Sequence, residues 1–570
     1  MKSLAVIALL LLTGNLMAQD KSKPQPADAI FINGNIWVGA QLVSPMPPVS
    51  RAQALAVQGD HLVAVGSNEE IKKLKGLNTT VVDLAGRFVL PGFNDAHLHL
   101  SAGGFEKLQV NLVGTKSLAE MKQRIADGVR KSAPNEWILG RGWDHTKWTE
   151  QVLPTRQDLD AVTGDHPAIF GRIDGHISVA NSAALKVAGI DRNTKAPSGG
   201  QIDRDANGEA TGILRESAVA LVGAKIPRPT PSQVRQAMEL ALADAAQWGL
   251  TSVQSQMLDN REWEDFLVCE DLEREGKLTT RVNMWLPFDG ELAKIQQWRA
   301  HHPASDPMLH TGMLKAYMDG SLGSRTAAMR EGFTDDPGNK GLSQWDPSKL
   351  NAMAAERADA GFQLGFHAIG DRGADMALDA FAEAQRFVRE HDQSRSRREP
   401  RNRIEHDQVI ESDQFARYKE LGVIASVQPN HLLTDMNWAE SHIGPARAKT
   451  SYPWRDFAKN GIMMAFGTDY PVEPLTPFRG IYAAVTRKNE EGTREYYPEQ
   501  KLTIDEALAA YTYGSAYGEY SERDKGQLKS GMLADFVVLD RDLTKIAPNE
   551  ILGTKVLRTV VGGKTVYKAD

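Results

Sequence analysis

Six side chains in this 570-residue sequence are of types that can bind divalent metal ions, and each lies at the end of a short apolar run. They are His97, His99, Lys315, His367, His406 and Asp469. Each run has the composition of a β-strand and is followed by Gly, Asp or Pro. Catalytic groups at the C-terminal ends of successive strands are typical of a (β/α)8 barrel. Imidazoles and carboxylates that converge on one point can bind a divalent ion, so the pattern indicates metal-dependent hydrolysis.

The first two histidines form an H-x-H pair in the segment PGFNDAHLHL. Residues i and i+2 of a strand point to the same face, so His97 and His99 can reach one ion. The alternative is a polar pair in the core. A second pair, His301 and His302 in WRAHHPASDP, is interpreted as a surface pair at a helix end.

Lys315 lies inside an apolar run, Met313 to Met318. A charged amine buried in a strand is costly, so either its tip reaches solvent or its pKa falls. An outward-pointing lysine is the structural alternative. A neutral amine can instead add CO2 and become a carbamate, an anionic bidentate ligand able to bridge two metal ions.

The remaining three residues also have structural alternatives. His367 in GFHAIGDRG and His406 in RIEHDQ could each be a core histidine, but their spacing of about 40 residues matches one barrel unit. Asp469 in AFGTDYPVEP could cap a helix. The prolines at 471 and 474 favour a loop after the strand instead.

The bulk properties indicate a soluble globular protein larger than one ordinary domain. With 41% hydrophobic residues and a mean hydropathy of −0.38, the chain can bury a core. Its length suffices for a large barrel plus a smaller unit. The net charge is −7 and no long basic run occurs, so nucleic acid is not an expected partner.

The N-terminus has the features of a secretory signal peptide, residues 1–18. Lys2 precedes an apolar stretch that is too short to span a membrane, and Ala18 suits signal peptidase. We therefore expect an exported protein, periplasmic or extracellular, without a stable membrane anchor; the alternatives are an uncleaved anchor or a merely apolar N-terminus. The single cysteine, Cys269, excludes an intramolecular disulfide and is interpreted as a buried thiol in a helix.

The chain order predicts an α/β protein with a barrel inserted into a β-sandwich. After a linker at 19–28, strand-like runs at 29–88 form the N-terminal part of the sandwich, and 528–570 form its C-terminal part. Alternating strand and helix patterns place a TIM-like (β/α)8 barrel at 89–527. Residues from about 105 to 215 fit this alternation poorly, so we predict an insertion after the first barrel strand that could cap the strand ends.

The motifs together resemble those of a known family. The sequence is similar to the amidohydrolase superfamily, specifically the YtcJ-like branch of amidohydrolase family 3, over nearly the whole mature chain. The resemblance is carried by VLPGFNDAHLHL, RGWDHTKW, DGHISVANSAAL, LKAYMDGSLGSRTAAM, HAIGDRG, RIEHDQ, FGTDYPVEPLTPF and KGQLKSGMLADFVVLDRD.

The resemblance implies a (β/α)8 barrel with a composite β-sandwich and one or two divalent ions, for which zinc is the expected metal. It assigns His97 and His99 to the first ion. It assigns His367 and His406 to the second. Lys315, as a carbamate formed from CO2, would bridge the two.

The resemblance also gives Asp469 two roles, as a ligand of the first metal and as the group that shuttles the proton. A metal-bound water has its pKa lowered toward neutrality, and Asp469 would take its proton. His145, His176 and Arg325 are candidates for contact with a small-molecule substrate; for Arg325 a structural role at a helix end is an equal alternative.

The expected function is hydrolysis of a C–N bond other than a peptide bond, in an amide, formamide or cyclic amide. Alternatives are an esterase or lactonase, a mononuclear deaminase, or a non-catalytic metal- or solute-binding protein. A deaminase would place a Glu in H-x-x-E after His367, where HAIGDRG has none. A proton acceptor at Asp469 favours an enzyme, and a homo-oligomer is compatible with the sequence.

Overall fold

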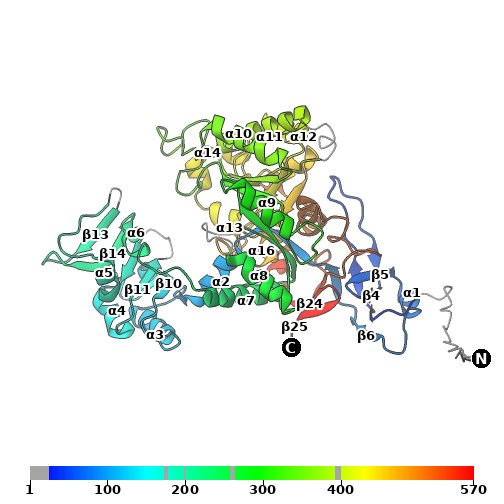
Figure 1. The fold of residues 1–570 in the computed structure, drawn as a ribbon, viewed down its shortest axis with the longest axis horizontal. Helices are drawn as coiled ribbons and strands as arrows, with labels where there is room; N and C mark the ends of the chain where they lie inside the picture. The colour runs from blue at the N-terminus through cyan, green and yellow to red at the C-terminus, as the bar shows by residue number, and fades with distance from the viewer. Residues whose placement is uncertain (1–24, 173–176, 198–199, 257–263, 392–398) are drawn as a thin grey trace, which may run out of the picture.

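The computed structural model describes residues 25–172, 177–197, 200–256, 264–391 and 399–570. Figure 1 shows three parts: a central barrel, a β-sandwich at one side and a lobe at the other. These parts are built on four β-sheets.

The barrel is a sheet of eight parallel strands in sequence order, which confirms the predicted α/β barrel. Its strands are β8 (Phe93–Leu98), β15 (Leu250–Gln256), β16 (Arg281–Pro287), β18 (Met313–Tyr317), β19 (Gln363–Ala368), β20 (Arg403–His406), β21 (Ile424–Val427) and β22 (Met464–Phe466). A short strand, β17 (Leu309–His310), pairs beside β16. The sheet closes just beyond β22, where the Asp469 amide donates to the His97 carbonyl and the His99 amide donates to the Tyr470 carbonyl, each at 2.7 Å.

Helices alternate with these strands along the chain, as the sequence pattern predicted. They include α2 (Leu100–Leu108), α7 (Pro231–Gln247), α8 (Glu264–Arg274), α9 (Leu292–His301), α10 (Pro347–Asp359), α11 (Asp371–His391), α12 (Gln414–Leu421), α13 (His431–Asp435), α15 (Trp454–Lys459) and α16 (Pro477–Thr486). Helix α7 shows why the local sequence is helical: Thr230 and Gln233 form a capping box and Pro231 occupies the first turn. Its residues Val234 and Met238, one turn apart, are buried.

The β-sandwich combines strands from both ends of the chain. One sheet has the order β5 (His61–Gly66), β4 (Ala54–Gln58), β1 (Ala29–Ile32) and β6 (Thr80–Asp83). The other has the order β25 (Lys564–Lys568), β24 (Val556–Val561), β23 (Phe536–Leu539), β7 (Phe88–Pro91), β2 (Asn35–Trp37) and β3 (Arg51–Ala52). The aromatic rings of Phe31 and Phe536 meet edge to face at 4.9 Å in the apolar core that these sheets share.

The lobe is a separate unit inserted between β8 and β15. Its sheet has the order β13 (Gly200–Arg204), β14 (Ala210–Glu216), β12 (Ile177–Ala180), β11 (Ala168–Arg172), β10 (Ile138–Trp143) and β9 (Val110–Asn111). Helices α3 (Leu118–Val129), α4 (Arg156–Thr163), α5 (Ser182–Ala188) and α6 (Val219–Gly223) accompany it.

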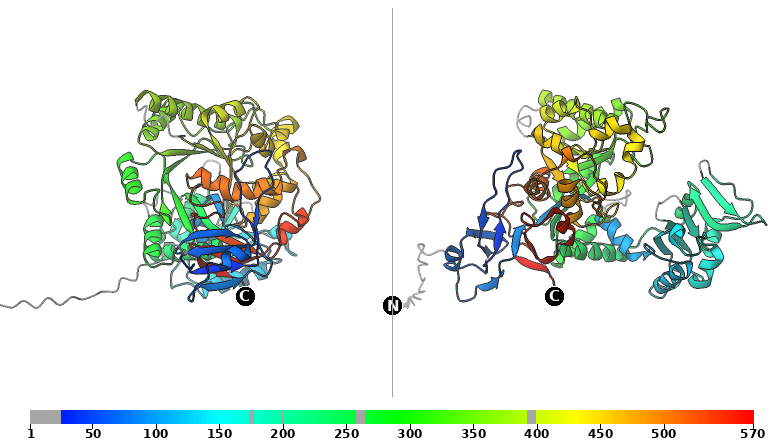
Figure 2. Two further views of the ribbon diagram at one scale, coloured as in Figure 1. Left: turned by 90° about the vertical axis from the view of Figure 1, so that its right-hand side faces the viewer. Right: turned by 180° about the vertical axis from the view of Figure 1, so that it is seen from behind.

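Figures 1 and 2 show the lobe standing beside the barrel, on the side where α2 and α13 lie. These helices follow the C-terminal ends of β8 and β21, so the lobe lies on the side of the barrel at which the strands end. Polar contacts join it to α2 and α7: Arg141 to Glu106 at 3.3 Å, and Gln233 to Glu136 at 2.9 Å.

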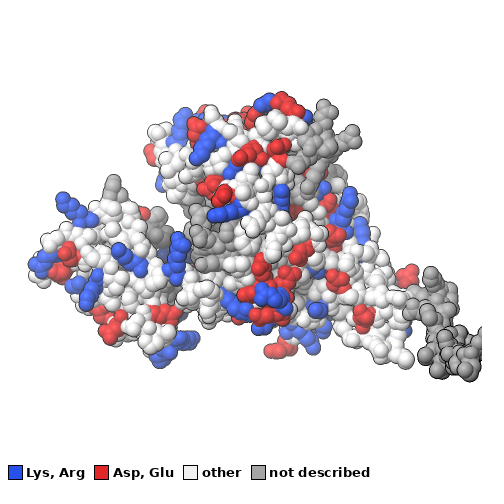
Figure 3. Space-filling view, in the orientation of Figure 1, with Lys and Arg blue, Asp and Glu red and all other residues white. Residues whose placement is uncertain are grey.

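Within the described residues, no helix combines the length and the apolar character needed to cross a membrane. On the face drawn in Figure 3, basic and acidic side chains are interspersed, and neither sign forms one continuous patch. That face therefore lacks the extended basic surface that a nucleic-acid backbone would require.

Candidate metal centre

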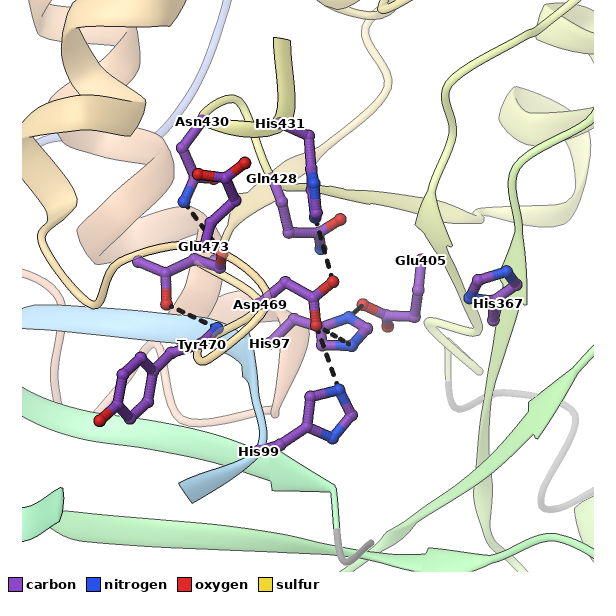
Figure 4. Close-up of polar contacts among 12 residues, drawn as sticks. His97, His99, His367, Glu405, Gln428, Asn430, His431, Asp469, Tyr470 and Glu473 are labelled. Carbon is purple, nitrogen blue, oxygen red and sulfur yellow. Dashed lines mark hydrogen bonds and ion pairs between the residues drawn. The ribbon is translucent and has the colours of Figure 1, made fainter. Parts of the chain in front are cut away.

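Three buried side chains meet where β8 and β22 end. The His99 Nε2 lies 3.1 Å from Asp469 Oδ1, and the His97 Nε2 lies 3.6 Å from the same oxygen. The three residues can present one ligand atom each within 4.8 Å of one another. Figure 4 shows both imidazoles beside the Asp469 carboxylate. This is the arrangement that the H-x-H spacing predicted for a single ion.

The close approach of the two strands depends on small and polar residues next to Asp469. A Cβ at Gly467 would lie 2.5 Å from the backbone nitrogen of His97, so only glycine fits there. Asp95 accepts hydrogen bonds from the Thr468 amide at 3.0 Å and from its hydroxyl at 2.6 Å. Asp469 itself has φ of +59°, a left-handed conformation that is strained for a residue with a side chain and common at functional sites.

His431, at the first position of α13, is part of the same centre and was missed from the sequence. Its Nε2 lies 3.0 Å from Asp469 Oδ2, on the side of the carboxylate opposite His99. Burial disfavours the imidazolium, but the hydrogen bond and negative charge of Asp469 outweigh it and raise the pKa of His431 to about 9. The strand-end pattern could have found it, since His431 follows the apolar strand β21 and the turn Gln-Pro-Asn.

Lys315 points into the barrel rather than outward. Its side chain is buried, and Nζ lies 3.4 Å from His97 Nε2 and above the rings of Trp285 and Tyr317, 5.4 and 5.2 Å from their centroids. Burial lowers the pKa of Lys315 to about 8, so a larger share of the amine is neutral than in water. The outward-pointing alternative is therefore excluded.

His367 and His406 lie side by side at the ends of β19 and β20, with ring centroids 4.4 Å apart. His406 is also 4.8 Å from the His97 ring and can share an ion with His431 and Asp469. The Nε2 of His367 is directed at the backbone and not at Asp469, because it donates to the Gly320 carbonyl at 3.0 Å. The barrel thus brings all six predicted residues to one end, with His367 at the edge of the cluster (Figure 4).

Three imidazoles of the centre, those of His97, His367 and His406, are held in the neutral form that binds metals. Burial and the nearby positive charge of Lys315 lower the pKa of His97 to about 4 and that of His367 to about 3. Burial and the neighbouring imidazoles lower the pKa of His406 well below its usual value. A neutral imidazole has the free lone pair that a metal needs, so these side chains can act as ligands without first losing a proton.

The buried ion pair between Arg403 and Glu405 orients His97. Its Nδ1 lies 2.7 Å from Glu405 Oε2, which leaves Nε2 facing Asp469. Burial would raise the pKa of Glu405, but Arg403 and the hydrogen bond from His97 outweigh it and lower the pKa to about 2. Arg403 donates from Nε to Glu405 Oε1 at 2.8 Å. An ionised carboxylate behind a ligating histidine fixes its tautomer and raises its basicity.

Of the three predicted substrate contacts, one lies in the lobe, one follows β18, and one falls outside the described residues. His145 is in the lobe, in a short 3-10 turn beside the Trp143 ring. Arg325 forms a bidentate ion pair with Asp335, at 3.0 and 2.6 Å. His176 lies outside the described residues. None of these three positions is tested by the geometry of the centre.

The fold and the cluster define the class of a metal-dependent hydrolase built on an α/β barrel. The family model of the amidohydrolase family matches residues 80–567. The chain therefore belongs to the amidohydrolase family, as its motifs suggested.

Relatives cover almost the full length. The chain is 31% identical to "Putative amidohydrolase YtcJ" of Bacillus subtilis over 94% of this chain and 99% of the relative. It is 27% identical to the N-substituted formamide deformylase of Arthrobacter pascens, over 95% of this chain and 99% of the relative. A crystal structure of an uncharacterized metal-dependent hydrolase from Pyrococcus furiosus matches with a TM-score of 0.74 and 30% identity, over 91% of this chain and 100% of the other.

The contact between Glu405 and His97 can be tested with Glu405→Gln, which keeps the side-chain volume and removes the charge. We expect divalent metal affinity to fall by about 10–100-fold, because His97 loses its anionic partner. Chelator competition measures the affinity. The exposed Glu420→Gln on α12 is the control, and thermal unfolding of both variants detects loss of fold. Unchanged metal affinity in folded Glu405→Gln would contradict this role.

Proposed function

We propose that this protein hydrolyses a C–N bond other than a peptide bond in a small molecule, such as an amide, a formamide or a cyclic amide. The observation that carries the proposal is the buried group of His97, His99 and Asp469 with ligand atoms within 4.8 Å. The formamide deformylase from Arthrobacter pascens, related over nearly the whole chain, supports the choice of bond.

The donor set fits a divalent ion of the zinc type, with imidazole nitrogens and carboxylate oxygens. His97, His99 and Asp469 would hold one ion. His367 and His406 would hold a second, with Lys315 as a carbamate between the two. Lys315 is buried with Nζ 3.4 Å from His97 Nε2, and this position supports its place in the proposed ligand set.

Bound metal would supply the acidity that makes water a nucleophile at neutral pH and would polarise the scissile carbonyl. Side chains of the protein transfer the proton of the attacking water. Asp469 accepts it from the attacking water and returns it to the leaving nitrogen. His431 contacts Oδ2 of Asp469 and His99 lies near Oδ1, so the two imidazoles restrain the carboxylate between them. This restraint would keep Asp469 oriented toward the attacking water.

The proposal is tested by turnover of N-substituted formamides, N-acyl amino acids, hydantoins and matched esters with metal-loaded protein. We expect hydrolysis of at least one C–N class, loss of activity after chelation, and recovery on adding zinc. Full activity in a metal-free sample, or turnover confined to esters, would contradict the proposal.

Asp469→Asn keeps the shape of the side chain and removes its basic oxygen. We expect turnover to fall by about 10²–10⁴-fold in a protein that remains folded. Turnover, metal content and thermal unfolding are measured on one sample, with the exposed Asp379→Asn on α11 as control. A variant that keeps its metal and loses less than about tenfold in rate would assign proton transfer to another group, His431 being next to test.

Lys315→Ala should lose both metal and activity, since it removes the amine that would carry the carbamate. A small carboxylic acid added to this variant should restore part of each by replacing the missing anion. The exposed Lys545→Ala is the control. Lys315→Arg with wild-type metal content and rate would contradict carbamylation, because a guanidinium does not take up CO2 to become an anionic ligand.

We also propose that the protein is exported and cut after Ala18. The basic Lys2, the apolar stretch and the small residue before Gln19 support this. N-terminal sequencing of the protein from the extracytoplasmic fraction should begin at or near Gln19. An intact Met1 on that material would contradict cleavage.

A further inference from the structure

A second group of metal-binding side chains lies on the outer layer of the barrel, away from the predicted centre. It comprises Glu270 on α8 and His301 and His302 at the end of α9, each offering one ligand atom within 4.8 Å of the others. The sequence predicted that both histidines are at the surface. That is right for His301, which is exposed, and wrong for His302, of which 5% is exposed.

His302 is buried because its ring stacks on two aromatic side chains. Its centroid lies 4.7 Å from Phe266 and 6.0 Å from Trp298, with interplanar angles of 27° and 12°. This packing leaves the imidazole little rotational freedom. Its Nε2 is directed at Glu270 Oε1, 2.7 Å away. One ligand of the group is therefore held in place before any ion arrives, which reduces the entropy lost on binding.

The end of α9 brings the neighbouring histidine to the same carboxylate. Successive residues of a continuous helix point about 100° apart, so adjacent side chains do not normally share a partner. The helix stops at His301, and His302 has φ of −120° and ψ of 72°, which turns its ring. As a result His301 Nε2 lies 3.5 Å from the same Glu270 Oε1.

The separations suit a tetrahedral ion. Ligands about 2.0–2.1 Å from zinc at tetrahedral angles are roughly 3.4 Å apart. The His301–Glu270 separation of 3.5 Å already has this value. The His302–Glu270 separation of 2.7 Å must open by roughly 0.7 Å, and a neutral His302 must carry its proton on Nδ1 to bind the ion through Nε2.

The surrounding charge is negative. Burial and the negative charges of Asp306 and Glu270 raise the pKa of Glu273, one helical turn beyond Glu270 on α8. The negative charges of Asp306 and Glu270 therefore reach Glu273, and a cation bound at Glu270 would reduce this repulsion. Cys269 takes no part, because it is fully buried in the apolar core.

We propose that Glu270, His301 and His302 form a peripheral site for a divalent transition ion, with zinc as the physiological candidate, which joins α8 to the end of α9. Two imidazoles and one carboxylate are a zinc ligand set, with the remaining position open to water. A chain with this site binds one ion more than the catalytic centre alone requires.

Equilibrium dialysis of full-length, zinc-loaded protein against rising free zinc tests the proposal. Wild type and the control His391→Ala, an exposed histidine on α11, should each bind one further zinc per chain. His301→Ala and Glu270→Gln should weaken this uptake by about tenfold or more and leave turnover unchanged. Thermal unfolding of the wild type should shift upward on uptake, and that of the two variants should not.

His97→Asn separates this site from the catalytic centre, since it should lose catalytic zinc and keep the peripheral ion. Uptake of no further zinc by wild type would overturn the proposal. Equal uptake and affinity in wild type, His301→Ala and Glu270→Gln would overturn it as well. Neither result bears on the catalytic centre, which is measured by turnover and by His97→Asn.

Discussion

The buried ion pair of Arg403 and Glu405 is the interaction on which the geometry of the barrel end depends. Both side chains are fully buried, and an unpaired charge there would cost several kcal/mol. The guanidinium donates to Glu405, to the Ala96 carbonyl at 2.7 Å and to the Ser426 hydroxyl at 2.7 Å. Arg403 therefore links β20 to β8 and β21 by hydrogen bonds. Because Ala96 precedes His97, the same guanidinium positions both the backbone of His97 and Glu405, the partner of its ring.

The buried carboxylates also explain how the basic side chains of Lys315 and His97 can lie close together away from solvent. Lys315 Nζ and His97 Nε2 are 3.4 Å apart, and two positive charges at that distance would repel strongly in a buried site. Burial keeps His97 neutral, while the charges of Glu405 and Asp469 favour the positive form of Lys315. A divalent ion fits such a site better than protons do, because it satisfies several lone pairs at once.

The sequence predicted the parts that depend on local pattern. Apolar runs followed by Gly, Asp or Pro located the barrel strands and hence the six side chains at their ends, since strand propensity and turn residues are read over a few positions. Glu405 was missed because its role depends on His97, 308 residues away. His431 was missed because three residues separate it from the end of β21, whereas the predicted ligands lie within their strands or closer to the strand ends. The burial of His302 depends on stacking with Phe266 from another helix, which local sequence does not reveal.

Anomalous diffraction at the zinc absorption edge, from crystals of the zinc-loaded protein, would locate an ion at the ends of β8 and β22. We expect an anomalous peak between His97, His99 and Asp469, about 2.0–2.1 Å from the imidazole nitrogens. Unperturbed positions for these three side chains with no anomalous peak among them, in crystals that diffract well enough to show zinc elsewhere, would contradict it.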